Sequence, residues 1–368
     1  MSRRKDYCFP MQNLLGKGLK GLKGPILVTG HTGFKGTWLT LLLECLDIPV
    51  VGLSQQPLEN SLFNKLSRRG LLNEEFGDIR DRKLVETVFE KFKPSAVIHM
   101  AAQPLVSEGY RSPILTFETN VIGTANILDI GVRSDGVSGI VSVTTDKVYR
   151  NNESGIKFKE QDPLEGKDPY SASKVGSEAS IAAWQQISKI NGGPPICSAR
   201  AGNVIGGGDY TEGRLMKDIS NSLINDMALE VRNFKSNRPW QHVLDPLRGY
   251  IGLLEHTLRT GESIAMNFGP REASLSVEQV VIKSREFWSD ITDTKDQTFL
   301  ETKQSLVQFA ESENLDLDSS LAASLLGWNP KWDQYESIER TLKWWHSVEC
   351  KKMDVEALCV SEVEEALS

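Results

Sequence analysis

The sequence predicts an α/β fold: a Rossmann-like doubly wound parallel sheet with a smaller C-terminal substrate-binding domain. Three observations support this prediction. Short apolar runs alternate with longer helical patterns in the first half of the chain, as in βα units. A glycine-rich turn follows the first apolar run. After about residue 205 the alternation breaks up into segments rich in Gly, Asp, Arg and Pro.

The expected strands are short apolar runs, and the expected helices lie between them. A short strand near residue 265, ending on a turn, returns the chain to this pattern. The expected strands are PILVTG (25–30), IPVVGLS (48–54), SAVIHMAA (95–102), GIVSVTTD (139–146), PICSARAGN (195–203) and SIAMNFGP (263–270).

Composition excludes several classes of protein. A net charge of -7 argues against a nucleic-acid surface. The five cysteines form no CxxC pair, so we expect neither a metal site nor a disulfide framework, and a cytoplasmic location fits best. No apolar run approaches the roughly 18 residues of a membrane span, and the N-terminus lacks the apolar core of a signal peptide.

The turn TGHTGFKG contains Gly30, Gly33 and Gly36 between a strand and a helix. Glycine permits positive φ and close backbone approach there, so a pyrophosphate can rest on the helix N-terminus. Alone, this spacing is equally consistent with a plain tight turn. Asp78, in GDIRD, and the small residues of HMAAQ favour dinucleotide binding.

The expected cofactor contacts extend beyond the three glycines. The second strand ends at Ser54 with no acid for a ribose hydroxyl, so it does not decide between NAD and NADP. The full set of expected cofactor contacts is Gly30, Thr32, Gly33, Phe34, Lys35, Gly36, Ser54, Asp78, Ile79, Ala101, Ala102, Asn120, Tyr170 and Lys174.

The segment YSASK places Tyr170 and Lys174 four residues apart, on one face of a helix. An ammonium there can lower the pKa of a phenol, which can then take a hydroxyl proton while hydride leaves for a nicotinamide. YxxxK is common by chance, but its position after the glycine turn and HMAAQ favours a catalytic pair.

Together these segments resemble the extended short-chain dehydrogenases/reductases, and within them the CDP-glucose 4,6-dehydratases. The resemblance runs from about Pro25 to Trp345 and includes TTDKVY, DPYSASK, ARAGNVIGGGD, RPWQHVLDPLRGY and NFGP. It implies a Rossmann domain, tightly held NAD and a nucleotide diphosphate hexose as substrate, most consistent with CDP-glucose. It also implies a dimer, or a dimer of dimers, formed through the helices at 116–130 and 170–184.

The resemblance assigns roles to Thr145, Asp146 and Lys147 in TTDKVY. Related dTDP-glucose dehydratases have Thr-Asp-Glu here, with a hydroxyl at the sugar 4-position, an acid near the 6-hydroxyl and a base near C5. Lys147 could act as that base only if its pKa fell well below about 10.4, and otherwise would stabilise an enolate. The alternative for Asp146 and Lys147 is a surface ion pair.

The expected substrate contacts gather in the C-terminal part. Arg238 and His242 could clamp a diphosphate, because guanidinium forms paired hydrogen bonds to phosphate oxygens. The resemblance places Asn203 at the same diphosphate. We also assign Gln103 and Arg214 to the substrate, although the loop around Arg214 departs from some relatives.

The implied reaction oxidises C4 with NAD, removes the C5 proton, expels the C6 hydroxyl as water and returns hydride to C6. Asp146 would serve as the acid if desolvation keeps it protonated. A nucleotide-sugar 4-epimerase, which needs no elimination, and a dehydratase for another nucleotide sugar are the alternatives. An idle NAD-binding regulator is disfavoured by the intact Thr145, Tyr170 and Lys174.

The predicted organisation has four parts. Two large units lie between a basic lead-in and an acidic peripheral helix or tail, and no nucleic-acid or membrane partner is expected. The parts are a lead-in that packs loosely against the first strand (1–24), an NAD-binding Rossmann domain (25–204), a mainly nucleotide-sugar-binding region interleaved with it near 240–267 (205–347), and the C-terminal tail (348–368).

Overall fold

The computed structural model describes residues 15–153, 155–293, 302–304 and 314–368. Its centre is a seven-stranded sheet in which every pair of neighbours is parallel, with the order β11-β6-β5-β4-β1-β2-β3. This confirms the predicted fold class. The strands are β1 (Ile26–Thr29), β2 (Val50–Ser54), β3 (Asn73–Phe76), β4 (Ala96–His99), β5 (Ile140–Val143), β6 (Ile196–Ala201) and β11 (Ala265–Phe268).

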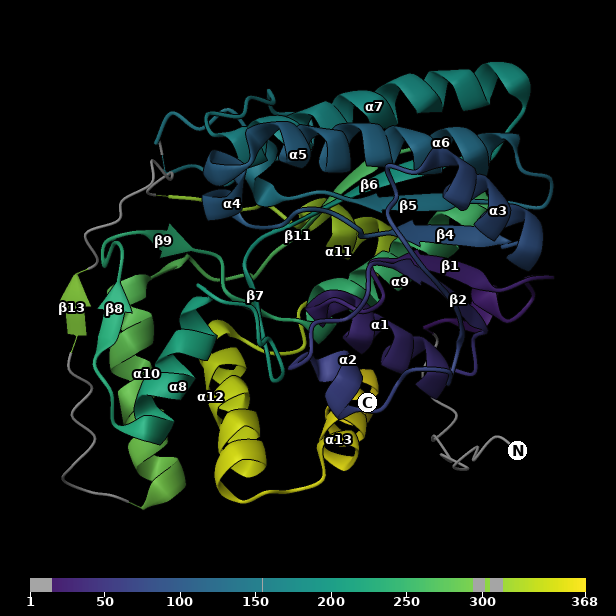
Figure 1. The fold of residues 1–368 in the computed structure, drawn as a ribbon. Helices are drawn as coiled ribbons and strands as arrows, with labels where there is room; N and C mark the ends of the chain where they lie inside the picture. Colours follow the sequence, from purple (N-terminus) through teal and green to yellow (C-terminus); the bar gives the residue numbers. More distant parts are fainter. Residues whose placement is uncertain (1–14, 154, 294–301, 305–313) are drawn as a thin grey trace.

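Helices cover both faces of this sheet, as Figure 1 shows. Successive strand residues point to opposite faces, so Leu27 joins one apolar core while Ile26 and Val28 join the other. One face carries α3 (Arg82–Phe92), α6 (Thr124–Arg133) and α7 (Pro169–Asn191). The other carries α1 (Phe34–Cys45), α9 (Leu244–Thr260) and α13 (Val355–Leu367).

The strand order reverses between β1 and β4, which are neighbours with Ile26 opposite Ala96. Ligands of doubly wound sheets bind at such a switch point, beyond the carboxyl ends of the strands. The glycine turn after β1 and the HMAAQ segment after β4 therefore meet at one edge of the sheet.

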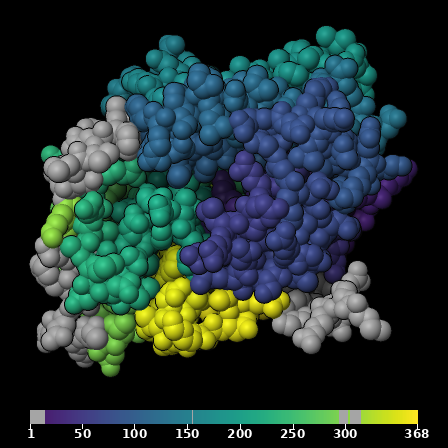
Figure 2. Space-filling model, in the orientation of Figure 1, coloured from purple at the N-terminus to yellow at the C-terminus, as the bar shows by residue number. Residues whose placement is uncertain are grey.

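A smaller layer has its own apolar core and stands apart from the large sheet in Figure 1. In Figure 2 its green residues and the blue residues of the larger layer meet on one face. Its elements are β7 (Val204–Ile205) with β10 (Gln241–His242), β8 (Leu229–Val231) with β13 (Thr302–Gln304), β9 (Asn237–Arg238) with β12 (Leu275–Ser276), α8 (Leu215–Asn225), α10 (Val277–Thr292) and α12 (Gln334–Trp345).

The ends of the chain pack more closely than the sequence suggests. Residues 1–14 of the expected lead-in lie outside the described residues. Leu19 is fully buried in the core, and the backbone N–H of Gly18 donates to the Glu255 carboxylate on α9 at 2.8 Å. At the other end, α13 buries Cys359 and Val363 against α1. The lead-in therefore packs on α9 as well as near β1, and the acidic C-terminal segment forms part of the core.

Candidate active site at the edge of the large sheet

A cavity of about 550 Å³ opens where the two layers meet, beyond the carboxyl ends of β5 and β6. The first turn of α1, the start of α7 and the first turn of α8 contribute to its walls. Its lining brings together eight of the residues predicted from the sequence: Lys35, Thr145, Asp146, Lys147, Tyr170, Asn203, Arg214 and Arg238.

Thr145, Asp146 and Lys147 lie where β5 ends and a short 3-10 helix, Asp146–Val148, begins. Asp146 and Lys147 form an ion pair, as the alternative expected, but the Asp146 side chain is buried and the pair lines the cavity rather than the surface. Asp146 Oδ1 accepts from the Thr145 hydroxyl at 2.9 Å and from Lys147 Nζ at 3.2 Å, while Oδ2 has no partner among the described residues. Lys147 Nζ also donates to Asn203 Oδ1 at 3.2 Å.

Tyr170 and Lys174 face the same side of α7. Asp168 caps this helix in a capping box with Ser171, and Pro169 occupies its first turn, so the start of the helix is fixed just before Tyr170. Lys174 Nζ donates to the Val143 carbonyl at the end of β5, at 3.2 Å. The helix start and this hydrogen bond together hold the pair beside Thr145.

Burial dominates the protonation of this pair. It raises the pKa of Tyr170 to about 12, and the Thr145 hydroxyl and the charge of Arg214 oppose that rise. Burial lowers the pKa of Lys174 to about 8, and the Glu178 carboxylate partly offsets this effect. Tyr170 is therefore a neutral phenol in the chain on its own, and proton abstraction needs further positive charge nearby.

Behind the pair lies an ion pair that the sequence analysis missed. Glu178 and Arg200 are both buried and bridged at 2.7 Å, and Glu178 also accepts from the hydroxyls of Thr144 at 2.5 Å and Ser198 at 2.6 Å. Glu178 lies four residues after Lys174 on the same helix. That spacing was the available sequence signal for it.

The glycine turn fits a dinucleotide. Gly30 has φ of 76°, and a Cβ on Gly36 would lie 2.0 Å from the Gly30 carbonyl oxygen. Gly33 is the N-cap of α1, and no described side chain caps the helix there, so its first N–H groups can receive a phosphate. Phe34 is half-buried against the apolar core.

Lys35 lies in the first turn of α1, and its side chain reaches the cavity. Its Nζ donates to the hydroxyl of Tyr250, on α9, at 2.9 Å. Burial and the charges of Lys174 and Arg214 lower the pKa of Lys35 to about 7. The sequence placed Lys35 with the cofactor contacts, whereas its side chain lines the cavity together with the catalytic residues.

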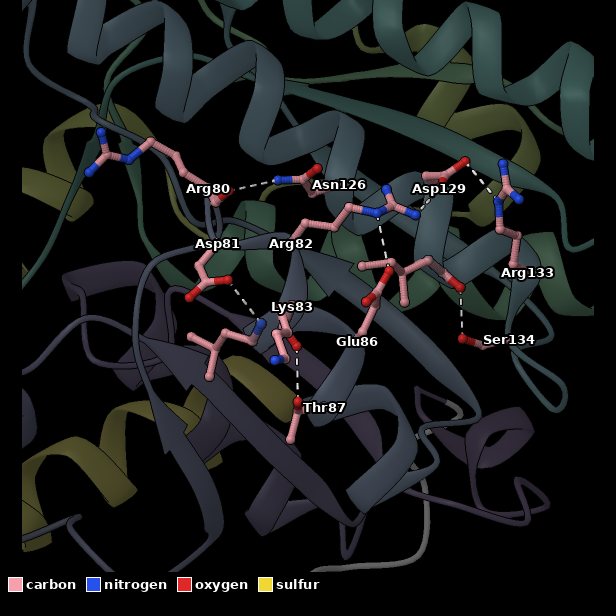
Figure 3. A network of polar contacts seen from close by, with 12 residues as sticks. Arg80, Asp81, Arg82, Lys83, Glu86, Thr87, Asn126, Asp129, Arg133 and Ser134 are labelled. Carbon is pink, nitrogen blue, oxygen red and sulfur yellow. Dashed lines mark hydrogen bonds and ion pairs between the residues drawn. The ribbon is translucent and has the colours of Figure 1, made fainter.

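The residues expected to contact the adenosine part of the dinucleotide lie near the ends of β2 and β3. Thr32 and Ser54 are joined through their hydroxyls at 2.7 Å, and Asp78 is held by Arg80 at 2.8 Å, which lowers its pKa. Asn126 Nδ2 donates to the carbonyl of Ile79 at 3.0 Å. Figure 3 shows Arg80 and Asp81, just before α3, with Asn126 of α6 bonded to the backbone of Arg80 as well.

The segment after β4 is fixed by Asn120. This side chain accepts from the backbone N–H of Gln103 at 2.8 Å and donates to the Gln103 carbonyl at 3.1 Å and to Ser173 at 2.9 Å. The Gln103 amide donates to Thr116 at 2.8 Å. Asn120 and Gln103 therefore position the backbone after Ala101 and Ala102, and neither lines the cavity.

Two arginines bring positive charge to the cavity. Arg238 is buried and donates to its neighbour's carbonyl, that of Asn237, at 2.8 Å. Arg214 lies 3.8 Å from Asp209 as an ion pair, and its Nε is buried without a hydrogen-bond partner among the described residues. An anion in the cavity would meet both guanidinium groups.

His242 does not reach the cavity lining. It is buried between aromatic rings, 4.6 Å from the Trp332 ring centroid and 6.4 Å from that of Trp38. Burial lowers its pKa to about 3, so the ring is neutral. The structure gives His242 a place in the core beside Trp332 rather than at a diphosphate.

Metal binding and membrane insertion find no support in the described residues. No three His, Cys, Asp or Glu side chains there are grouped so that they could hold a metal ion. None of the helices in the described part of the chain has the length and apolar character needed to cross a membrane.

Known proteins resemble this chain over most of its length. Among curated relatives, the CDP-glucose 4,6-dehydratase of Salmonella typhimurium is 39% identical over 328 residues, which are 87% of this chain and 89% of the relative. A UDP-glucose 4-epimerase of Rhizobium leguminosarum bv. trifolii is 26% identical over 87% of this chain and 92% of the relative.

Solved structures match over most of both chains. The UDP-glucose 4-epimerase of Thermus thermophilus, in complex with NAD, superposes with a TM-score of 0.75 at 22% identity, covering 88% of this chain and 99% of its own. The dTDP-glucose 4,6-dehydratase DesIV of Streptomyces venezuelae, a double mutant with NAD bound, gives 0.75 at 23% identity, covering 90% and 99%. Residues 27–341 match the family described as GDP-mannose 4,6 dehydratase, and the chain therefore belongs to this family of nucleotide-sugar dehydratases.

Proposed function

We propose that this protein catalyses the NAD-dependent dehydration of CDP-D-glucose to CDP-4-dehydro-6-deoxy-D-glucose and water. The observation that carries the proposal is the cavity, in which Tyr170 lies with Thr145, Asp146 and Lys147 while Arg214 and Arg238 supply charge for a diphosphate. The 39% identity to a CDP-glucose 4,6-dehydratase over most of both chains supports the choice of nucleotide and sugar.

The cofactor in this proposal is NAD. Gly30, Gly33 and Gly36 leave room for a pyrophosphate at the start of α1, and Ser54, Asp78 and Ile79 would face the adenosine end. When bound, NAD accepts hydride from the sugar and returns it within the same turnover. Its nicotinamide also supplies positive charge, which favours the phenolate form of Tyr170.

Tyr170 is the proposed base for the C4 hydroxyl, and Thr145 positions that hydroxyl. The ammonium of Lys174, fixed on the Val143 carbonyl, stabilises the phenolate. Oxidation at C4 makes the C5 proton acidic, because the carbanion that forms is an enolate.

Asp146 and Lys147 are the proposed groups for elimination. The unpartnered Oδ2 of Asp146 can deliver a proton to the departing C6 hydroxyl. Lys147 Nζ, held between Asp146 and Asn203, lies where it can take the C5 proton or stabilise the enolate. An epimerase has no use for an acid and a further charged group at this point.

The competing 4-epimerase leaves C5 untouched, so isotopes separate the two reactions. In heavy water we expect the product to carry deuterium at C5 and to have lost one water. Substrate labelled with deuterium at C4 should give product labelled at C6, without net build-up of NADH. A product of unchanged mass with no solvent deuterium at C5, measured by mass spectrometry, would replace the dehydratase with the epimerase.

We also propose that the protein assembles through α5 (Pro113–Phe117), the adjoining π-helix η2 (Glu118–Gly123) and α7, as a dimer or a dimer of dimers. Exposed apolar side chains on this face support the proposal, among them Ile114 at 72% and Ile122 at 53% exposure. A cytoplasmic location is proposed from the cysteine pattern of the sequence.

A further inference from the structure

The cavity continues beyond the part that a hexose needs. Tyr170, the proposed base for the C4 hydroxyl, lines this cavity, and Asn203, Arg214 and Arg238 line it as well. Further walls come from α8, β8 and the start of α10, which belong to the smaller layer in Figure 1. If the site takes a nucleotide diphosphate sugar, these elements offer a surface for its base.

Asp218, on α8, is distinctive among the acids of this outer part. Asp209 is paired with Arg214, and Glu212 and Glu230 are exposed to solvent. Asp218 is half-buried and lines the cavity, yet its carboxylate has no hydrogen bond or ion pair with any described residue. Its carboxylate is therefore an acceptor that no described side chain or backbone group of the protein occupies.

The surroundings of Asp218 keep this acceptor available. Burial raises its pKa to about 6, while the charges of Lys217 and Arg232 oppose the rise and those of Asp209 and Glu212 add to it. The group is thus mostly ionised near neutral pH. A ligand N–H that donates to this partly desolvated carboxylate makes the free energy of binding more favourable, whereas a ligand carbonyl placed against it makes binding less favourable.

We propose that Asp218 reads the nucleotide base by accepting a hydrogen bond from the exocyclic amino group of cytosine. Cytosine presents an N4 amino donor where uracil and thymine present the O4 acceptor, and a carboxylate is the natural partner of that donor. This inference rests on the proposed function, since it requires the cavity to hold a nucleotide sugar. It assigns the preference for a cytidine diphosphate sugar to one side chain.

The expected size of the effect follows from the charge of the acceptor. A site that hydrogen-bonds a polar group strongly rejects an analogue that cannot complete the bond. Losing a hydrogen bond to a charged group corresponds to roughly 10- to 100-fold in binding. Asn is close to Asp in shape and can turn its amide to donate, so Asp218→Asn should remove the preference rather than the site.

The test compares kcat/KM for CDP-glucose and UDP-glucose in the parent, Asp218→Asn and Asp226→Asn. Asp226 lies at the end of the same helix, is exposed and does not line the cavity. Asp226→Asn therefore removes the same negative charge as Asp218→Asn without changing the cavity. In Asp218→Asn we expect the preference for CDP-glucose to fall by about 10-fold or more. The control should keep the parental preference.

Calorimetric titration with CDP and UDP, without turnover, separates this inference from the proposed function. If the parent dehydrates CDP-glucose and Asp218→Asn keeps the full preference, Asp218 does not read the base and the dehydratase stands. The parent could instead turn over no nucleotide sugar but prefer CDP to UDP, with that preference lost in Asp218→Asn. This outcome would support the role of Asp218 in recognising the base and would refute the proposed dehydration. Melting temperatures of both variants verify that each is folded.

Discussion

Tyr170 shows how much a single residue depends on its surroundings. Burial raises the pKa of its phenol to about 12, and the hydrogen bond of the Thr145 hydroxyl and the charge of Arg214 oppose that rise, so its reactivity as a base must come from such neighbours and from the cofactor. Replacing Tyr170 with Phe removes the hydroxyl and keeps the ring. We expect turnover of CDP-glucose to fall by a factor on the order of 10² or more, with the fold and nucleotide binding retained.

The matched control for Tyr170→Phe is Tyr335→Phe, which deletes the same hydroxyl from a side chain that is 39% exposed on α12. Its turnover should equal that of the parent. Turnover of Tyr170→Phe within a few-fold of the parent would show that another group takes the C4 proton.

His242 illustrates a residue that the sequence placed at the substrate and the structure places in the core. The folded pKa is about 3 and the ordinary value is 6.5, so the unfolded chain binds a proton that the folded chain does not. The free energy of unfolding therefore falls as pH drops below about 6.5. His99, whose pKa burial also lowers to about 3, adds to this effect.

His242→Phe tests this assignment through the slope of stability against pH. The free energy of unfolding is measured with urea near pH 6.5 and near pH 5. It should decrease between these two pH values by about 2 kcal/mol less in the variant than in the parent. Affinity for CDP should not change. An unchanged slope together with weaker CDP binding would restore His242 as a diphosphate ligand.

At the level of elements, the sequence predicted the strands that are apolar runs and missed β3. Its residues, Asn73 to Phe76, read NEEF, and the strand is recognisable only from its pairing with β2, where Val51 lies opposite Asn73. An edge strand needs little apolar character because only part of it is buried. The sequence pattern therefore identified the apolar strands, including the edge strand β11, and missed the polar edge strand β3.

Some residues of the candidate site could likewise be predicted from the sequence and others could not. Short motifs with fixed spacing identified Gly30, just after a strand, and Tyr170, at the start of a helix, and the family resemblance added Thr145. Asp218 is a single residue on α8 with no local pattern to mark it, and Tyr250, at the end of the motif RPWQHVLDPLRGY, was given no role of its own. Their roles become recognisable only in the folded chain, where Asp218 lines the cavity and Tyr250 accepts a hydrogen bond from Lys35.

Helix packing also changes the reasoning about association. The family resemblance implied association through the helices at 116–130 and 170–184, which carry small residues that would allow two copies to approach closely. In the structure they serve contacts within the chain: a Cβ on Gly176 would lie 2.7 Å from a Val121 methyl group, and Ser177 donates to the Asn120 carbonyl at 2.7 Å. The exposed apolar residues beside them now provide the stronger argument.

For the whole molecule, the face formed by α5 and η2 exposes Ile114, Phe117 and Ile122 close together in sequence. Apolar side chains gathered on one face mark association surfaces, and twofold pairing would bury the same face of both copies. Light scattering at micromolar concentration should give a mass of at least roughly twice the 40.9 kDa of one chain.

Ile122→Glu places a charge at the centre of that face and should shift the mass toward one chain, because an unpaired charge is costly to bury. Ile282→Glu makes the same change on α10, where the isoleucine is 46% exposed on the smaller layer, and should leave the mass unchanged. A parent that already scatters as a single chain would rule out the association. Equal loss of mass in both variants would mean that copies meet elsewhere than at α5 and η2.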